Sequence, residues 1–101
     1  MLAIFSTFPL DKGQTLGEDV SEAIRLIDES GLDYQTTAMG TIVEGEWDEV
    51  MSLIKECHHK LRENSKRVNT KISIDDRAGA EGRLKGKVAD IEKIIGREVK
   101  K

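Results

Sequence analysis

The sequence predicts an α+β fold in which two helices cover one face of a four-stranded antiparallel sheet and a third helix follows. Two observations carry this prediction. Two kinds of segment follow one another along the chain. Short segments have continuous or alternating apolar residues, as strands do, and longer segments have apolar residues every three or four positions, as helices do. Only 4% of the 101 residues are aromatic. We therefore expect one small domain over residues 1–101 with an aliphatic core.

The first third of the chain predicts a strand followed by a helix. Residues 2–8 are mostly apolar, which predicts a central strand covered on both faces. A helix is expected over residues 16–30. Thr15 and Glu18 have the spacing of a capping box at its start, and Gly31 offers a left-handed cap at its end.

The middle of the chain predicts a strand pair and a second helix. Residues 32–37 and 39–44 are typical of two strands joined by a tight turn. Apolar residues then recur at helical spacing from Trp47 to Leu61. A second amphipathic helix is therefore expected, with Trp47 on the stripe that faces the core.

The last third predicts a fourth strand over residues 68–75 and a third helical stripe over residues 84–95. The resulting order β-α-β-β-α-β-α is the ferredoxin-like βαββαβ arrangement with an extra C-terminal helix. Two helices cover one face of such a sheet and leave the other open. On that open face the fourth strand would present Asn69, Lys71 and Ser73. A ligand or a second subunit is expected there.

Composition and charge argue against several classes of function. Charged residues make up 35% of the chain, yet the net charge is only -3. A nucleic-acid-binding domain would be basic, so no nucleic-acid partner is expected. No apolar run approaches the ~18 residues of a membrane-spanning helix, so no membrane partner is expected either. The single cysteine, Cys57, lies on or beside an apolar stripe, which favours a buried inert thiol. A lone cysteine cannot form an internal disulfide, so a cytoplasmic protein is expected.

Four carboxylates surround Gly45. Three of them, Glu46, Asp48 and Glu49, fall in the first turn of the predicted second helix, where the helix dipole favours negative charge. Capping and solvation explain these three. Glu44 differs because it closes a strand, and there its carboxylate can accept hydrogen bonds from a cationic or amino-bearing ligand.

Other polar and aromatic residues have two interpretations each. Trp47 can pack in the core and also wall a flat heterocycle. Arg77 follows a strand end, either in a solvated turn or facing an anion or a subunit interface. His58 and His59 are adjacent, so their side chains point about 100° apart on a helix and cannot share a metal ion. No metal site is expected.

Two segments resemble a family of small ferredoxin-like proteins described as thiamine-binding proteins. Residues 39–51 are similar to the family pattern Thr-x-(Ile/Val)-Glu-Gly-x-(Trp/Phe)-(Asp/Glu)-(Asp/Glu)-(Val/Ile)-Met. Residues 67–72, followed by Asp75 and Arg77, are similar to the fourth strand of the family. One departure concerns residues 9–11, because family members commonly have a glycine soon after the proline that ends strand one.

The resemblance implies a homodimer or homotetramer built through sheets and edges. It also implies thiamine or its hydroxymethylpyrimidine part as a ligand, held without catalysis and with no cofactor. The motif positions that the resemblance marks are Thr41, Glu44, Trp47, Arg67, Thr70 and Arg77.

A pyrimidine ligand needs a flat wall, an acceptor for its amino group and a dry cleft. Phe8, Met39 or Trp47 would supply walls, and Glu44 or Asn69 would contact the amino group. The expected ligand-binding residues are Ser6, Thr7, Met39, Thr41, Glu44, Trp47, Asn69 and Arg77. An oligomeric interaction or regulatory protein without a small-molecule ligand is the alternative. An enzyme is not expected, because no nucleophile–base pair is evident.

Overall fold

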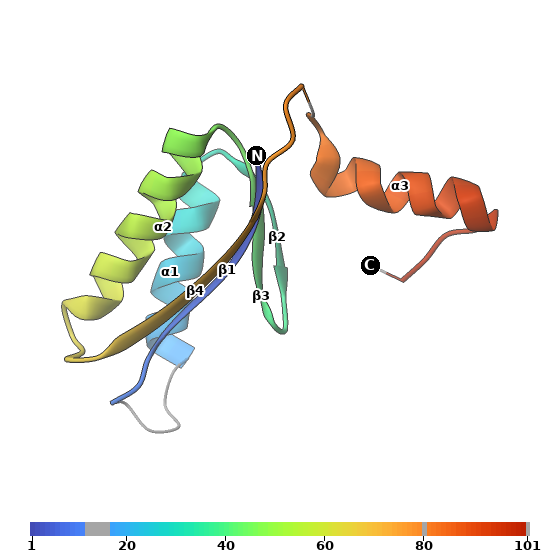
Figure 1. Cartoon of the computed structure of the whole chain (residues 1–101). Helices are drawn as coiled ribbons and strands as arrows, with labels where there is room; N and C mark the ends of the chain where they lie inside the picture. Colours follow the sequence, from blue (N-terminus) through green and yellow to red (C-terminus); the bar gives the residue numbers. More distant parts are fainter. Residues whose placement is uncertain (12–16, 80, 101) are drawn as a thin grey trace.

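The computed structural model describes residues 1–11, 17–79 and 81–100 (Figure 1). The sheet has the strand order β2-β3-β1-β4, and every neighbouring pair is antiparallel. The elements in chain order are β1 (Leu2–Pro9), α1 (Gly17–Glu29), β2 (Asp33–Thr37), β3 (Gly40–Glu44), α2 (Trp47–Arg62), β4 (Val68–Asp75) and α3 (Arg83–Ile95). This confirms the predicted α+β, ferredoxin-like arrangement with an extra C-terminal helix.

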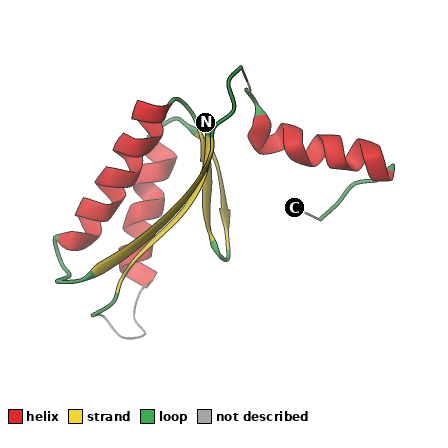
Figure 2. Ribbon diagram, in the orientation of Figure 1, coloured by secondary structure: helices red, strands yellow, loops and turns green. Residues whose placement is uncertain are grey.

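The three helices divide between the two sides of the sheet. Figure 2 shows α1 and α2 on one side and α3 on the other. α3 begins beside the end of β3 and extends away from the sheet, so it leaves most of that face uncovered. The strand register places Asn69, Lys71 and Ser73 on this open face, opposite Phe8, Ser6 and Ile4 of β1. The predicted polar set of strand four is therefore confirmed.

Several local predictions are also confirmed. Gly31 has a positive φ of 79° just after α1, as a left-handed cap requires. The backbone N–H of Glu46 donates to the Glu49 carboxylate at 3.3 Å, which supports the start of α2. The predicted capping box of the first helix includes Thr15, which lies outside the described residues.

The core lies between the sheet and the pair α1 and α2. The buried cluster consists of Ala3, Phe5, Ala23, Ile27, Val43, Val50, Leu53, Ile54 and Cys57. Burial raises the pKa of Cys57 to about 11, with the nearby Glu56 charge acting in the same direction. The raised pKa favours the protonated thiol at neutral pH, and the prediction that Cys57 is buried is confirmed.

Two predictions about packing were wrong. The first concerns β1, which is central but covered on one face only. Ala3, Phe5 and Thr7 face the helices, whereas Ile4 is exposed on the other face. The continuous apolar pattern suggested two covered faces, but α3 is held at one end of the sheet, by Glu44 of β3 and Asp75 of β4. It extends away from there and leaves Ile4 of β1 exposed.

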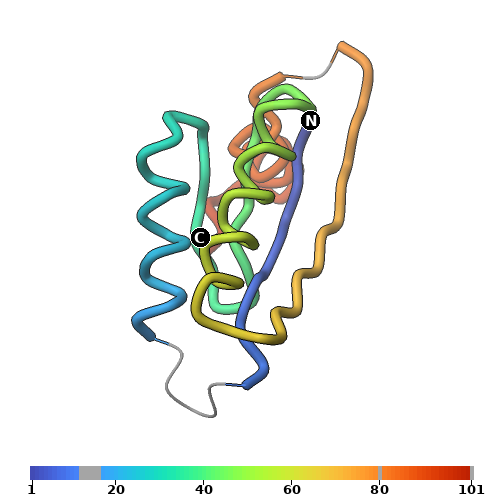
Figure 3. Tube along the Cα trace, turned by 90° about the vertical axis from the view of Figure 1, so that its left-hand side faces the viewer, coloured from blue at the N-terminus to red at the C-terminus, as the bar shows by residue number. Residues whose placement is uncertain are grey.

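The second concerns Trp47, whose exposed fraction is 51%. Trp47 lies one turn before Met51, on the flank of α2 that faces β4. Figure 3 shows β4 running along the side of the molecule beyond the cover of α2. An indole on that flank has no layer above it, so helical spacing alone overestimated its burial.

Candidate functional site

The sheet is incomplete beside one half of β1. β1 pairs with β4 along its whole length, from Leu2 to Pro9. Its pairing with β3 covers only Leu2 to Phe5, because β3 starts at Gly40. Within the described part of the chain, no strand therefore pairs with residues 6–9 on their β3 side. An unpaired strand edge presents backbone N–H and C=O groups to whatever lies next to it.

The β2–β3 hairpin approaches β1 very closely where the pairing stops. A Cβ atom on Gly40 would lie 2.9 Å from the carbonyl oxygen of Phe5 and 3.3 Å from the Ile4 side chain. A glycine is required at this contact, because a larger residue would push the hairpin away from β1. Gly40 thereby sets one wall of the gap beside residues 6–9.

A cavity of about 480 Å³ lies in this gap, between α1, the hairpin and β1. Its lining combines apolar side chains from α1 and β1 with small polar side chains from the strands. The lining residues are Phe5, Ser6, Thr7, Phe8, Val20, Ala23, Ile24, Ile27, Thr36, Thr37, Ala38, Met39, Gly40, Thr41 and Lys71.

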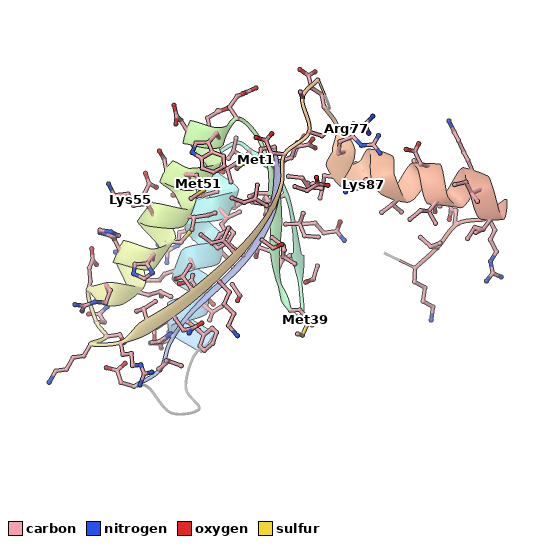
Figure 4. The ribbon with its side chains drawn as sticks, viewed as in Figure 1. Met1, Met39, Met51, Lys55, Arg77 and Lys87 are labelled. Atoms are coloured by element: carbon pink, nitrogen blue, oxygen red, sulfur yellow. The ribbon has the colours of Figure 1, made fainter. Side chains whose placement is uncertain are left out.

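Four of the expected ligand-binding residues meet at this cavity: Ser6, Thr7, Met39 and Thr41. Figure 4 shows Met39 at the tip of the hairpin, where its side chain is 85% exposed. Thr7 and Thr41 are buried on the helix-covered side of the sheet. The Oγ1 atoms of Thr7 and Thr70 lie 2.7 Å apart, and Thr70 Oγ1 lies 2.7 Å from Nδ1 of His58.

Sequence reasoning missed the contribution of α1 to the cavity. All four residues of its apolar stripe line the cavity, and two of them, Ala23 and Ile27, are buried; the other two are Val20 and Ile24. The four residues recur at three- and four-residue steps, and this spacing predicts only that they face the core. It does not predict which of them border a cavity. Lys71 is predicted on the open face but is not among the expected ligand-binding residues. The strand register brings it opposite Ser6, where it lines the cavity.

The other expected residues lie away from the cavity. Glu44 and Arg77 occupy the opposite end of the sheet, and Figure 4 shows Arg77 and Lys87 together beside the start of α3. Asn69 of β4 lies opposite Phe8 of β1. The Oδ1 atom of Asn69 is buried and has no hydrogen-bond partner among the described residues. Trp47 belongs to the flank of α2. None of these four lines the cavity.

Glu44 is fully engaged by the start of α3. Its carboxylate accepts hydrogen bonds from the backbone N–H groups of Arg83 at 2.8 Å and of Leu84 at 3.0 Å. Partial burial acts to raise the pKa of Glu44, but these two bonds, the charged N-terminus and Arg83 outweigh it and lower the pKa. The carboxylate thus fastens α3 to the sheet as an anion at a helix N-terminus.

The space around Glu44 is small. A crevice of about 30 Å³ is lined there by Met1, Leu2, Glu44, Asp75, Arg77, Arg83 and Lys87. That volume suits a water molecule and not a ring. Lys87 forms an ion pair with Asp75, and this hydrogen-bonded ammonium lowers the pKa of Asp75. The charges at this end of the sheet largely bond to one another.

Comparison with known proteins identifies the family. The family described as thiamine-binding protein matches residues 3–92. The chain belongs to that family. It is 39% identical over 96 residues to the UPF0045 protein Mb1933 of Mycobacterium bovis, a match that covers 94% of both chains. It is 32% identical over 94 residues to the UPF0045 protein MJ1052 of Methanocaldococcus jannaschii, covering 93% of this chain and 94% of that protein.

Solved structures agree with the fold of this thiamine-binding family member. The crystal structure of hypothetical protein MJ1052 has a TM-score of 0.82 and 33% identity, covering 89% of this chain and 93% of that one. A structure from Thermotoga maritima, TM0486, has a TM-score of 0.78 and 29% identity, covering 89% and 96%. The name of that protein is "putative thiamine biosynthesis/salvage protein".

The family description names a small molecule and no reaction. Within the described residues, no three histidine, cysteine or acidic side chains are grouped so that they could hold a metal ion. In the same part of the chain, none of the helices combines the length and the hydropathy needed to span a membrane.

Proposed function

We propose that this chain is a non-catalytic binding protein for thiamine or its hydroxymethylpyrimidine part, held in the cavity beside β1. The observation that carries the proposal is a cavity of about 480 Å³ next to the unpaired edge of β1, in a member of the thiamine-binding family. Small-molecule sites commonly enclose roughly 300–1,000 Å³ and combine apolar walls with a few polar groups.

The lining matches the chemistry of an aminopyrimidine. The flat ring would pack against apolar side chains such as Ile24 and Met39. Its amino group and ring nitrogens would bond to the hydroxyls of Thr7 and Thr41 and to backbone groups of the unpaired edge. Lys71 places a positive charge at the same cavity. The neutral hydroxymethylpyrimidine is therefore expected to bind more tightly than the positively charged thiamine.

Calorimetry on the purified chain tests this proposal. Thr41→Val removes one cavity hydroxyl and keeps the side-chain shape, and it should weaken hydroxymethylpyrimidine binding about threefold to tenfold, since one hydrogen bond contributes about 0.5–1.5 kcal/mol. Ser52→Ala removes an exposed hydroxyl from α2 and should leave the affinity unchanged. Absence of heat at millimolar ligand, or equal weakening in both variants, contradicts the proposal. The proposal that the protein does not catalyse a reaction predicts that the ligand is recovered chemically unchanged after incubation with it.

The second candidate function is self-association, and exposed apolar surface favours it. α3 carries Ile91, Ile94 and Ile95 with exposed fractions of 51%, 83% and 50%. The open sheet face adds Ile4. The radius of gyration is 15.0 Å, compared with about 13 Å for a compact chain of this length. We propose that a second copy of the chain covers these surfaces. Light scattering should give the molar mass of a dimer or tetramer. Ile94→Glu should lower the measured mass toward that of the monomer.

A further inference from the structure

Three polar side chains form a hydrogen-bonded chain from the outside of the molecule to the cavity beside β1. His58 of α2 and Thr70 of β4 are joined by 2.7 Å between Nδ1 and Oγ1. Thr70 and Thr7 of β1 are joined by 2.7 Å between their Oγ1 atoms. His58 lines a hollow between α2 and β4, whereas Thr7 lines the cavity. The chain therefore links an outer histidine to the proposed binding site.

The number of hydroxyl protons decides which groups donate and which accept along this series of hydrogen bonds. If Nδ1 of His58 accepts, Thr70 donates to His58 and Thr7 donates to Thr70, so both hydroxyl protons are bonded. If Nδ1 donates, Thr70 donates to Thr7 and the proton of Thr7 is left over.

The first direction is favoured by the surroundings of Thr7. Its exposed fraction is 9%, and among the described residues its hydroxyl contacts no hydrogen-bonding partner other than Thr70. Buried O–H donors are rarely left unpaired, whereas a second lone pair on an oxygen often is. Both protons are bonded only when His58 accepts.

We propose that His58 is a positioning residue that makes Thr7 a hydrogen-bond acceptor toward the cavity. Because the Thr7 proton is committed to Thr70, its oxygen has only a lone pair to offer a ligand. The cavity then prefers a ring that carries an amino group over the same ring with a carbonyl in its place. This inference rests on the proposed function, because the ligand occupies the same cavity.

A purely structural role would have a different signature. Thr7 and Thr70 lie directly opposite each other in the β1–β4 register, so they could pair without any third group. In that case the loss of the His58 acceptor would leave ligand preference unchanged. Lys55 and His59 also line the hollow. Among the described residues of α2, however, the hydrogen bond to Thr70 is made by His58.

The experiment compares two ligands by calorimetry. One is the hydroxymethylpyrimidine with its exocyclic amino group, and the other is the analogue with a carbonyl at that position. The wild-type chain should prefer the amino compound by about tenfold. Thr70→Val frees the proton of Thr7 to turn into the cavity, so the preference should fall to about twofold. Thr70→Ser keeps the relay hydroxyl and should restore the wild-type ratio.

Substitution of His58 gives the matched pair of variants. His58→Leu removes the acceptor and should lower the preference as Thr70→Val does. His58→Asn keeps an acceptor near the position of Nδ1 and should retain most of it. An unchanged preference in both Thr70→Val and His58→Leu, with native circular dichroism, overturns the inference.

Nitrogen NMR of the His58 imidazole decides the direction of the chain without any ligand. A neutral ring with an unprotonated Nδ1 supports the inference, and a neutral ring with its proton on Nδ1 overturns it. If neither pyrimidine binds to any variant, the proposed function fails, while the NMR result still decides whether His58 accepts from Thr70.

Discussion

The two ends of the sheet use polar residues in opposite ways. At the Glu44 end, charged groups close the structure: Glu44 bonds two N–H groups of α3, Lys87 pairs with Asp75, and Arg83 lies 3.0 Å from Asp90. At the hairpin end, about 13 Å away along β3, hydroxyl side chains and Lys71 line a cavity beside an unpaired strand edge. The paired charges thus hold α3 to the sheet, whereas the small hydroxyls beside the short strand line the cavity that we propose as the ligand site.

The same motif contributes to both ends. Thr41 points toward the helices and lines the cavity, whereas Glu44 lies on the other face and holds α3. The odd separation between these positions sends the two side chains to opposite faces of one strand. Gly45 has a packing role, because a Cβ atom there would lie 3.0 Å from the Leu32 side chain. A motif that looks like one site in sequence therefore serves three separate purposes.

The largest expected effect is at the hairpin end. Gly40→Ala places a Cβ atom against the Phe5 carbonyl, at a φ of 154° that other residues rarely adopt. It should lower the free energy of unfolding by about 2–3 kcal/mol and weaken ligand binding in the cavity. Urea denaturation measures the first effect and calorimetry the second.

Gly79→Ala is the matched control for that variant. Gly79 also has a positive φ, of 75°, but no described residue places an atom within 4 Å of its added Cβ atom. It should cost only about 1 kcal/mol and leave binding unchanged. Equal losses in the two variants would show that backbone strain, and not the close approach to β1, explains the effect.

An intermediate effect is expected at the Glu44 end. Glu44→Gln removes the negative charge that accepts from Arg83 and Leu84, and it should cost about 1–2 kcal/mol. Hydrogen exchange of these two amides should speed up, whereas amides of α1 should keep their protection. Glu56→Gln, at an exposed position within α2, serves as the control. Unchanged exchange at Arg83 and Leu84 would contradict the fastening role.

The smallest effect is the response of the same contact to acid. The pKa of Glu44 is lower in the folded chain than its ordinary value, so the unfolded chain takes up the proton first. The stabilisation is therefore complete above the ordinary glutamate pKa and is lost as the pH falls through the lowered folded value. NMR should show α3 amides shifting in that range before α1 amides do. Glu44→Gln should abolish this difference.

Much of the fold followed from local pattern. The apolar period separated strands from helices, and Gly31 ended α1 where a left-handed cap was expected. These signals depend on neighbours within a few residues, which the sequence displays directly. The motif in residues 39–51 likewise identified the family.

Half of the expected site residues proved distant from the cavity, for tertiary reasons. The bonds from Glu44 reach residues about forty positions later in the chain, and no local pattern announces such a partner. The exposure of Trp47 depends on how far α2 reaches toward β4. The contributions of Val20 and Ile24 depend on how α1 lies beside the hairpin.

The sequence by itself determined the order of elements, the aliphatic core and the family, because periodicity, caps and motif residues are local properties. Only the tertiary structure decided where the cavity lies. The cavity exists because the pairing of β1 with β3 stops four positions short of the end of β1, and strand register is set by long-range pairing. The same long-range packing joined His58, Thr70 and Thr7 into one hydrogen-bonded chain.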